Sequence, residues 1–145
     1  YKLAHSYEQN KNLDKAILLF EELIKKRPDD IPAYQRLIDL NITAKNEVRA
    51  ISLLEQTTLL QPQNPDVFTK YGTSLLRMQK TSEGIAKLEK AISLDSGFGE
   101  AYYFTALTYQ QIEDSAKESQ ILDACLSKVS QESPWRQKCQ ELKNQ

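Results

Sequence analysis

Glycine, proline, cysteine and histidine are all scarce in this sequence of 145 residues, which contains four, five, two and one of them. Because glycine and proline interrupt helices most strongly, their scarcity favours helix over most of the chain. The two cysteines, Cys125 and Cys139, form neither a Cys-x-x-Cys pair nor a metal-ligand spacing. We interpret each most simply as a small buried apolar residue, and their pairing state stays open.

An excess of charge of one sign is also absent, since 19 basic side chains accompany 20 acidic ones and the net charge is -1. The sequence therefore gives no reason to expect binding to nucleic acid or to an anionic membrane. No apolar run approaches the roughly 20 residues that a membrane span needs. The chain begins without Met or a leader segment, as a piece of a longer protein would, so we predict no cellular compartment.

The sequence contains no cluster of the side chains that catalysis or metal binding requires. The single histidine, His5, has only Glu8 and Gln9 near it in the sequence. It fits a groove or surface position better than the role of general base or metal ligand. The four glycines are too scattered to form a phosphate-binding loop. We therefore predict no catalytic residues, no metal site, no cofactor and no enzymatic activity.

What the sequence does contain is an internal repeat, which is the first feature to seek in any chain. An alanine followed four residues later by Phe or Leu occurs at Ala16 and Ala50, and Gly84 occupies the next position in that register. Each unit carries two amphipathic helical patterns joined by a short polar turn. Other positions aligned at the same step of thirty-four are Tyr34, Phe68 and Tyr102; Leu3, Leu37, Tyr71 and Thr105; and Pro28 and Pro62.

This pattern resembles the tetratricopeptide-repeat (TPR) family, whose 34-residue unit has an aromatic-Leu-Gly-Tyr first helix and an Ala-Phe-Ala second helix. The clearest unit is residues 65–95, which carry Phe68, Gly72, Leu75, Gly84, Leu88 and Ala91. The resemblance implies an all-α fold, a right-handed α-solenoid of four helix-turn-helix repeats plus a C-terminal capping helix. We predict one domain over 1–145, with repeats 1–30 (truncated at its N-terminus), 31–64, 65–98 and 99–132, and the cap at 133–145.

Three positions depart from the family's pattern. Asn41 stands where a large aromatic residue is usual, and Thr57 stands where a small residue is usual. Glu118 replaces the small residue at the closest approach of the two helices, where bulk prevents close packing. Two readings of the fourth unit follow: its helices splay apart at Glu118, or its second helix is shifted along the sequence.

The predicted cap begins at Ser133 and Pro134, a capping side chain followed by a proline suited to the first helical position. Its apolar stripe contains Trp135, Cys139 and Leu142, which we expect to cover the apolar face of the last helix pair. The remaining side chains of the segment, Arg136, Lys138, Glu141 and Lys143, are predicted to stay solvated.

In the TPR family, one face of the first helix of each repeat lines a concave groove in which ligands lie. The resemblance places Tyr102 and Tyr109 in the packing stripe. It places Tyr103 on the groove face, although Tyr103 packing only on the neighbouring helix is an equal reading. The groove residues predicted in this way are His5, Gln9, Gln35, Asp39, Thr69, Thr73, Arg77, Tyr103, Leu107 and Gln110.

The function implied is a protein-protein interaction module, a scaffold that binds a peptide or helical segment of a partner in the concave groove. On the same face the acidic residues outnumber the one basic residue, Arg77, so the expected partner is basic or of mixed polarity; these acidic residues are Glu8, Asp39, Asp66 and Glu100. A chaperone C-terminal tail is not expected, since Asp66 would repel its carboxylate. The alternatives are an assembly or homo-oligomerisation module, docking by the convex face or the open N-terminal edge, and a substrate-presenting domain of a larger enzyme.

Overall fold

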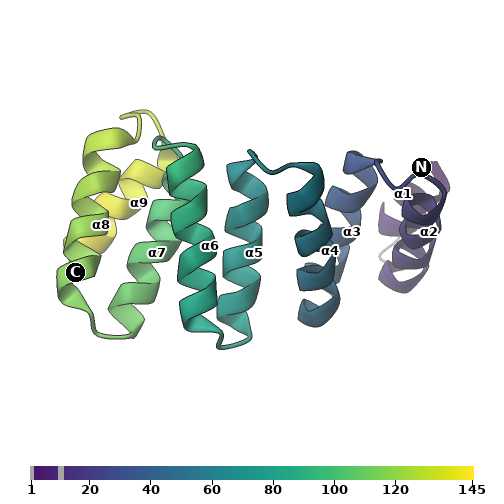
Figure 1. Cartoon of the computed structure of the whole chain (residues 1–145), viewed down its shortest axis with the longest axis horizontal. Coiled ribbons are helices and arrows are strands. Elements are labelled where there is room, and N and C mark those ends of the chain that lie inside the picture. Colours follow the sequence, from purple (N-terminus) through teal and green to yellow (C-terminus); the bar gives the residue numbers. More distant parts are fainter. Residues whose placement is uncertain (1, 10–11) are drawn as a thin grey trace. The chain divides into compact units, whose positions relative to one another are not determined.

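The computed structural model describes residues 2–9 and 12–145, apart from the side chains of residues 5, 8 and 9. Within these residues the secondary structure is entirely helical, as Figure 1 shows. The helices are α1 (Lys2–Gln9), α2 (Leu13–Lys26), α3 (Ile31–Thr43), α4 (Glu47–Leu60), α5 (Pro65–Arg77), α6 (Thr81–Leu94), α7 (Gly99–Gln111), α8 (Ser115–Lys128) and α9 (Pro134–Lys143). The prediction of an all-α fold of helix pairs followed by a further C-terminal helix is therefore confirmed.

The chain divides into two compact units, Tyr1–Pro62 and Gln63–Gln145, which we call unit 1 and unit 2. In unit 1, α1 packs on α2, α2 on α3, and α3 on α4. In unit 2, α5 packs on α6, α6 on α7 and α7 on α8, and α9 contacts both α7 and α8. Because α7 also contacts α5, the helices α5, α7 and α9 are neighbours, and we call the surface that they form the first-helix face of unit 2.

The repeat step determines where the helices begin. The second helices start at residues 13, 47, 81 and 115, and the first helices α3, α5 and α7 start at 31, 65 and 99. The start of α8 thus keeps the common register, which excludes the shifted reading of the fourth unit. A cavity of about 330 Å³ lies beside Glu118 among residues of α7, α8 and α9. The splayed reading stays a prediction.

Side-chain caps mark some of the helix starts, among them those of α5 and α9. The Asn64 side chain accepts a hydrogen bond from the backbone N–H of Asp66 (3.0 Å), directly before Pro65 at the start of α5. The Ser133 hydroxyl accepts one from the backbone N–H of Trp135 (3.3 Å), directly before Pro134 at the start of α9. Both pairs satisfy a helix N–H group with a side-chain oxygen and place proline where a helix tolerates it.

The closest helix approach in unit 2 is between α5 and α6, which lie side by side in Figure 1. A Cβ atom on Gly84 would lie 2.7 Å from Leu76 Cγ and 3.0 Å from the carbonyl oxygen of Gly72. A Cβ atom on Gly72 would lie 2.9 Å from the carbonyl oxygen of Gly84. The two backbones can therefore approach this closely only because both residues lack a side chain.

Asn41 and Thr57 depart from the repeat pattern, and each forms a side-chain hydrogen bond within its own helix. Asn41 is buried, and its side-chain N–H donates to the carbonyl of Leu37 (2.8 Å). Thr57 is also buried, and its hydroxyl donates to the carbonyl of Leu53 (2.7 Å). Since a buried polar group is costly only when it lacks a partner, these departures from the repeat pattern do not disturb the packing.

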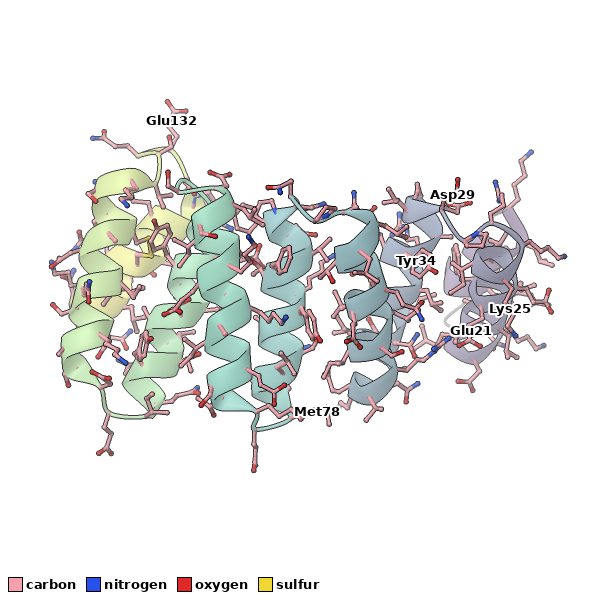
Figure 2. The ribbon with its side chains drawn as sticks, in the orientation of Figure 1. Glu21, Lys25, Asp29, Tyr34, Met78 and Glu132 are labelled. Atoms are coloured by element: carbon pink, nitrogen blue, oxygen red, sulfur yellow. A yellow bond between two sulfur atoms is a disulfide. The ribbon has the colours of Figure 1, made fainter. Side chains whose placement is uncertain are left out.

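The turns from α3 to α4, from α5 to α6 and from α7 to α8 contain a left-handed residue at a constant position. Lys45, Gln79 and Glu113 have φ values of 60°, 61° and 60°, and they occupy equivalent positions of successive repeats. Gln79 follows Met78, which Figure 2 labels at the turn between α5 and α6. Left-handed backbone costs a residue with a Cβ atom about 1–2 kcal/mol, so each of these turns contains local strain.

We expect Gln79→Gly to raise the free energy of unfolding by about 0.5 kcal/mol, because relief of the left-handed strain exceeds the entropic cost of glycine. Gln79→Val should lower it by at least about 1 kcal/mol, because a β-branched residue is poorly tolerated at positive φ. Thermal unfolding followed by circular dichroism measures both changes. As a control, Lys90→Gly at an exposed position inside α6 should be destabilising by about 1 kcal/mol. Equal effects of glycine at 79 and 90 would contradict the strain.

The C-terminal helix is attached to α8 by a covalent bond. A disulfide joins Cys125 of α8 to Cys139 of α9, and both residues are fully buried. The interpretation of the cysteines as two separate apolar residues is therefore wrong, although their burial was predicted correctly. The sequence separation is 14 residues, and the segment between them contains the turn that folds α9 back onto α8.

Arg136 also differs from its predicted solvated state. Its guanidinium donates a hydrogen bond to the carbonyl of Val129 (3.1 Å) and contacts the carbonyl of Leu126. These carbonyls lie at the C-terminal end of α8, where the last carbonyls of a helix lack partners within the helix. Arg136 is thus half-buried because it caps α8, and Lys143 adds an ion pair with Asp123 of the same helix.

Candidate functional site

The predicted groove residues are distributed over both units. Gln35 and Asp39 lie half-buried on α3 in unit 1. His5 and Gln9 fall in α1, but their side chains lie outside the described part of the chain. The other six are in unit 2, with Thr69, Thr73 and Arg77 on α5 and Tyr103, Leu107 and Gln110 on α7.

A cavity of about 300 Å³ lies between α5 and α7 on the first-helix face, and it brings three of these six together. Thr69 does not reach it, because Thr69 is buried and its hydroxyl donates to the carbonyl of Pro65 (2.9 Å). Gln110 lines the separate cavity beside Glu118. The residues that line the α5–α7 cavity are Thr73, Leu76, Arg77, Phe104, Leu107, Thr108 and Gln111.

Threonine hydroxyls in this cavity are bonded to their own helices. Thr73 donates to the carbonyls of Thr69 (3.0 Å) and Lys70 (3.1 Å), and Thr108 donates to the carbonyl of Phe104 (2.7 Å). Both hydroxyls therefore have partners within their own helices, and Leu76, Phe104 and Leu107 add apolar side chains to the lining. The cavity is thus suited to an apolar side chain of a ligand.

Two polar side chains lie at one end of the α5–α7 cavity. Arg77 and Gln111 occupy equivalent positions one repeat apart, at the C-terminal ends of α5 and α7, and both are exposed. A guanidinium presents its donors as a planar fork that matches a carboxylate, and an amide supplies both a donor and an acceptor. This end of the cavity is therefore suited to an acidic or carbonyl-bearing group next to an apolar anchor.

Three aromatic rings form a cluster next to the cavity. The centroid of Tyr103 lies 5.6 Å from those of both Phe104 and Trp135, and the centroids of Phe104 and Trp135 are 6.0 Å apart. All three side chains are half-buried. Tyr103 thus packs against α9 and keeps some exposed surface, and its place in a ligand groove stays a prediction. We call these three residues the aromatic cluster, and Phe104 belongs to it and to the cavity.

Tyr102 and Tyr109, the other two tyrosines of α7, are in the core, as predicted. Tyr102 is 1% exposed and Tyr109 is 5% exposed. The Tyr102 hydroxyl donates to the carbonyl of Ser96 (3.2 Å), and the Tyr109 hydroxyl donates to the carboxylate of Glu89 (3.2 Å). Burial raises the pKa of both phenols, and nearby acidic residues add to the shift.

Gly99 is the reason that Trp135 can lie against α7. A Cβ atom on Gly99 would lie 2.7 Å from the Cβ atom of Trp135 and 2.9 Å from a methyl carbon of Val129. The absence of a side chain at the first position of α7 lets the start of α9 approach it. The glycine before the aromatic residues thus serves the packing of α9 on α7.

Charged residues gather around the N-terminal ends of α5 and α7. Asp66 and Lys70 form an ion pair (3.6 Å) on α5. Burial raises the pKa of the Glu100 carboxyl, the charge of Asp66 raises it further, and Lys70 and Lys138 oppose the shift. The ammonium of Lys138 also lies 4.0 Å from the centroid of the Trp135 ring and 5.6 Å from that of Tyr103. The first-helix face of unit 2 therefore has charges of both signs at this end.

Neither a metal cluster nor a membrane span occurs in the described part of the chain. No group of three His, Cys, Asp or Glu side chains among residues 2–9 and 12–145 is placed to hold a metal ion. Over the same residues, every helix is too short or too polar to cross a membrane.

Reasoning from the sequence missed Phe104, Thr108, Gln111 and Trp135 as residues of this face. The signal for Gln111 was present, because it stands one repeat after Arg77. Phe104 likewise stands one repeat after Lys70. Trp135 gave no such signal, since its position follows from how α9 folds back onto α7.

Comparison with known proteins was made for the sequence and for the fold. Residues 7–72 match the model of a tetratricopeptide-repeat family. A crystal structure of MamA superposes with a TM-score of 0.80 at 17% identity, covering 97% of this chain and 82% of that one. A second MamA crystal structure gives 0.79 at 18% identity, covering 87% of this chain and 69% of that one.

The structure of MamA residues 41 to the end, from Desulfovibrio magneticus RS-1, gives a TM-score of 0.76 at 17% identity. It covers 99% of this chain and 73% of that one. No curated protein matches the sequence. At these identities the structural similarity establishes a shared helical-repeat fold.

Proposed function

We propose that this chain is a protein-interaction scaffold that binds a segment of a partner protein in a groove formed by first helices. Residues 7–72 match the model of a tetratricopeptide-repeat family, which supports this proposal. In unit 2 the groove corresponds to the first-helix face. The observation that carries this proposal is the α5–α7 cavity, which is continuous with the aromatic cluster through Phe104.

The aromatic cluster has the properties of an interaction hot spot. Tyr and Trp offer a large contact area at a low cost in side-chain entropy, and such residues often dominate the energy of an interface. Tyr103 and Trp135 fix each other's position through ring contact while remaining half-buried. A partner segment that covers them removes the remaining apolar surface from water without requiring the rings to reorganise.

We expect Tyr103→Ala and Arg77→Ala each to weaken partner binding about tenfold or more, since each removes a contact at the centre of the proposed surface. The partner is first captured by pull-down with this chain and identified by mass spectrometry, and its segment is then titrated against each variant by calorimetry. Circular dichroism checks that the helical content is unchanged.

Lys25→Glu is the matched control for these two variants. Lys25 is an exposed residue of α2 in unit 1, and Figure 2 labels it there. This substitution should leave the affinity unchanged. The opposite result, in which Lys25→Glu weakens binding while Tyr103→Ala and Arg77→Ala do not, would mean that the partner binds the surface of the second helices. An assembly function would then take the place of groove binding.

A further inference from the structure

We propose that the disulfide between Cys125 and Cys139 controls the first-helix face of unit 2, because its redox state decides whether α9 stays in that face. In the oxidised chain α9 is held on α8, and its Trp135 ring completes the aromatic cluster. Reduction by a dithiol lets α9 move away from α7 and α8, and Trp135 leaves the cluster with it. This inference rests on the proposed groove-binding function and adds a means of regulating that site.

Trp135 is the member of the aromatic cluster that depends on α9. Tyr103 and Phe104 belong to α7, and the Trp135 ring reaches them from the start of α9, with centroid distances of 5.6 Å and 6.0 Å. The two α7 rings also contact each other (5.6 Å), so they remain adjacent when α9 moves. Departure of α9 therefore removes the largest ring of the cluster and leaves in place the α5–α7 cavity, whose lining comes from α5 and α7.

The contacts that hold α9, other than the ring contacts of the cluster, are few. Cys139 and Leu142 are the buried residues of α9, and Cys139 is half of the disulfide. Lys143 forms an ion pair with Asp123, but both side chains are exposed, where such pairs contribute little. Arg136 adds its hydrogen bonds to the end of α8. Because a helix of ten residues is marginal in water by itself, the covalent bond is a main contributor to the docking of α9.

The disulfide closes a short loop, since its cysteines are separated by 14 residues. In the chain-entropy model a loop of this length favours the closed form about a hundredfold. Without the bond, α9 opens correspondingly more often. The opening is local to α9, because α7 and α8 stay packed on each other through Tyr102, Ala106 and Leu122.

Reduction of this bond is a thiol–disulfide exchange. One thiolate of the dithiol attacks a cysteine sulfur and releases the other as a thiolate, and the second thiol then displaces the protein from the mixed disulfide. The protein gains two electrons and two protons and holds two thiols, while the dithiol becomes a disulfide. Cys125 and Cys139 are both 0% exposed, so the reductant reaches the bond only when the helices around it open.

A ligand that covers Trp135 opposes this opening. By thermodynamic linkage, the factor by which reduction weakens ligand binding equals the factor by which the bound ligand favours the oxidised state. The bond is therefore predicted to be harder to reduce when the first-helix face of unit 2 is occupied.

The first test needs no ligand. Hydrogen exchange followed by mass spectrometry compares the oxidised chain with the chain reduced by a phosphine. We expect the amide protection of residues 134–143 to fall about a hundredfold on reduction, because α9 then opens that much more often. The amides of α6, which packs on α5 and α7, should keep their protection as the internal control. The variant Cys125→Ala/Cys139→Ala should exchange like the reduced parent and should not respond to the reductant.

The second test measures binding. A library of random 12-residue peptides displayed on phage is selected on the whole oxidised chain, and a peptide that Tyr103→Ala weakens is kept. Reduction of the chain should weaken this peptide about tenfold or more, and so should Trp135→Ala in the oxidised chain. Reduction of Trp135→Ala should then cause little further loss, since the ring through which reduction acts is already absent.

The outcomes separate this inference from the proposed function. Unchanged protection of α9 on reduction overturns the inference alone, provided that Tyr103→Ala still weakens the peptide. A loss of affinity on reduction that is as large in Trp135→Ala as in the parent also overturns it, because the effect then does not pass through Trp135. A selection that enriches no peptide above a control surface counts against the proposed function, and the exchange data then decide whether reduction releases α9.

Discussion

Gly84→Leu is expected to lower the free energy of unfolding by about 3 kcal/mol, which corresponds to a fall of roughly 10 °C in Tm. Even a Cβ atom at this position would lie 2.7 Å from Leu76 and 3.0 Å from the backbone oxygen of Gly72, so a leucine must move α5 away from α6. Because Leu76 lines the α5–α7 cavity, the substitution should also weaken ligand binding.

Lys80→Leu is the control for this change, since it adds the same side chain at an exposed position only four residues before Gly84. Its Tm should stay within roughly 2 °C of the parent value, because the Lys80 side chain makes no capping hydrogen bond and its ion pair with Glu83 is exposed, where such pairs contribute little. Thermal unfolding by circular dichroism compares the three proteins. Equal melting temperatures would mean that the two glycines do not form a close helix crossing.

Loss of the disulfide between Cys125 and Cys139 is expected to lower the free energy of unfolding by about 3 kcal/mol, the value for a closed loop of this length in the chain-entropy model. Denaturant unfolding should show a lower midpoint for the double variant Cys125→Ala/Cys139→Ala than for the oxidised parent. Treatment of the parent with a phosphine reductant should shift its midpoint in the same direction.

The double variant supplies the control for reduction, because the reductant should have no effect on it. Trp135 is the single tryptophan of the chain and belongs to α9, so its fluorescence reports on this helix. We expect its emission to shift to the red at a lower denaturant concentration once the disulfide is lost. Titration of two free thiols shows that the disulfide of the parent protein has been reduced. If the denaturant midpoint of that reduced protein is unchanged, packing alone holds α9.

Much of the fold could be predicted from the sequence because the repeat is a local property. Once Gly84 is aligned with Ala50 one repeat earlier, the starts of α4, α6 and α8 follow from one register. The core positions of Tyr102 and Tyr109 follow too, since residues seven apart lie on one face of a helix. The TPR resemblance then supplied the packing of one pair on the next, which periodicity alone does not give.

The candidate site was predicted less completely, because a cavity depends on the contacts between two helices. Thr69 falls on the predicted face by periodicity, yet it is 1% exposed and bonded to its own helix. Gln110 and Gln111 are adjacent and chemically identical, and only the second lies in the α5–α7 cavity. A shift of one residue along the sequence turns a side chain by about 100° around the helix. The sequence pattern does not determine the exposed face of a helix to within one residue.

The features that the sequence did not reveal at all involve α9. The disulfide and the caps that Arg136 forms on α8 both require that α9 folds back onto α8, and nothing in the spacing of Cys125 and Cys139 indicates this. Glu118 is an intermediate case. The sequence marks it as bulky for a helix crossing, and the observed start of α8 excludes the shifted helix.

The constant repeat step has a consequence for how the length of such a chain can change. Asp30, Asn64 and Phe98 precede three first helices at equal intervals, and the left-handed turn residues follow the same interval. Gain or loss of one whole repeat between equivalent positions keeps every cap, turn and crossing in phase. Gain or loss of a single residue inside a helix turns the rest of its apolar stripe by about 100° away from its partner. Within the helices, length can therefore change without loss of phase only in whole repeats, and each added repeat adds one first helix to the proposed binding face.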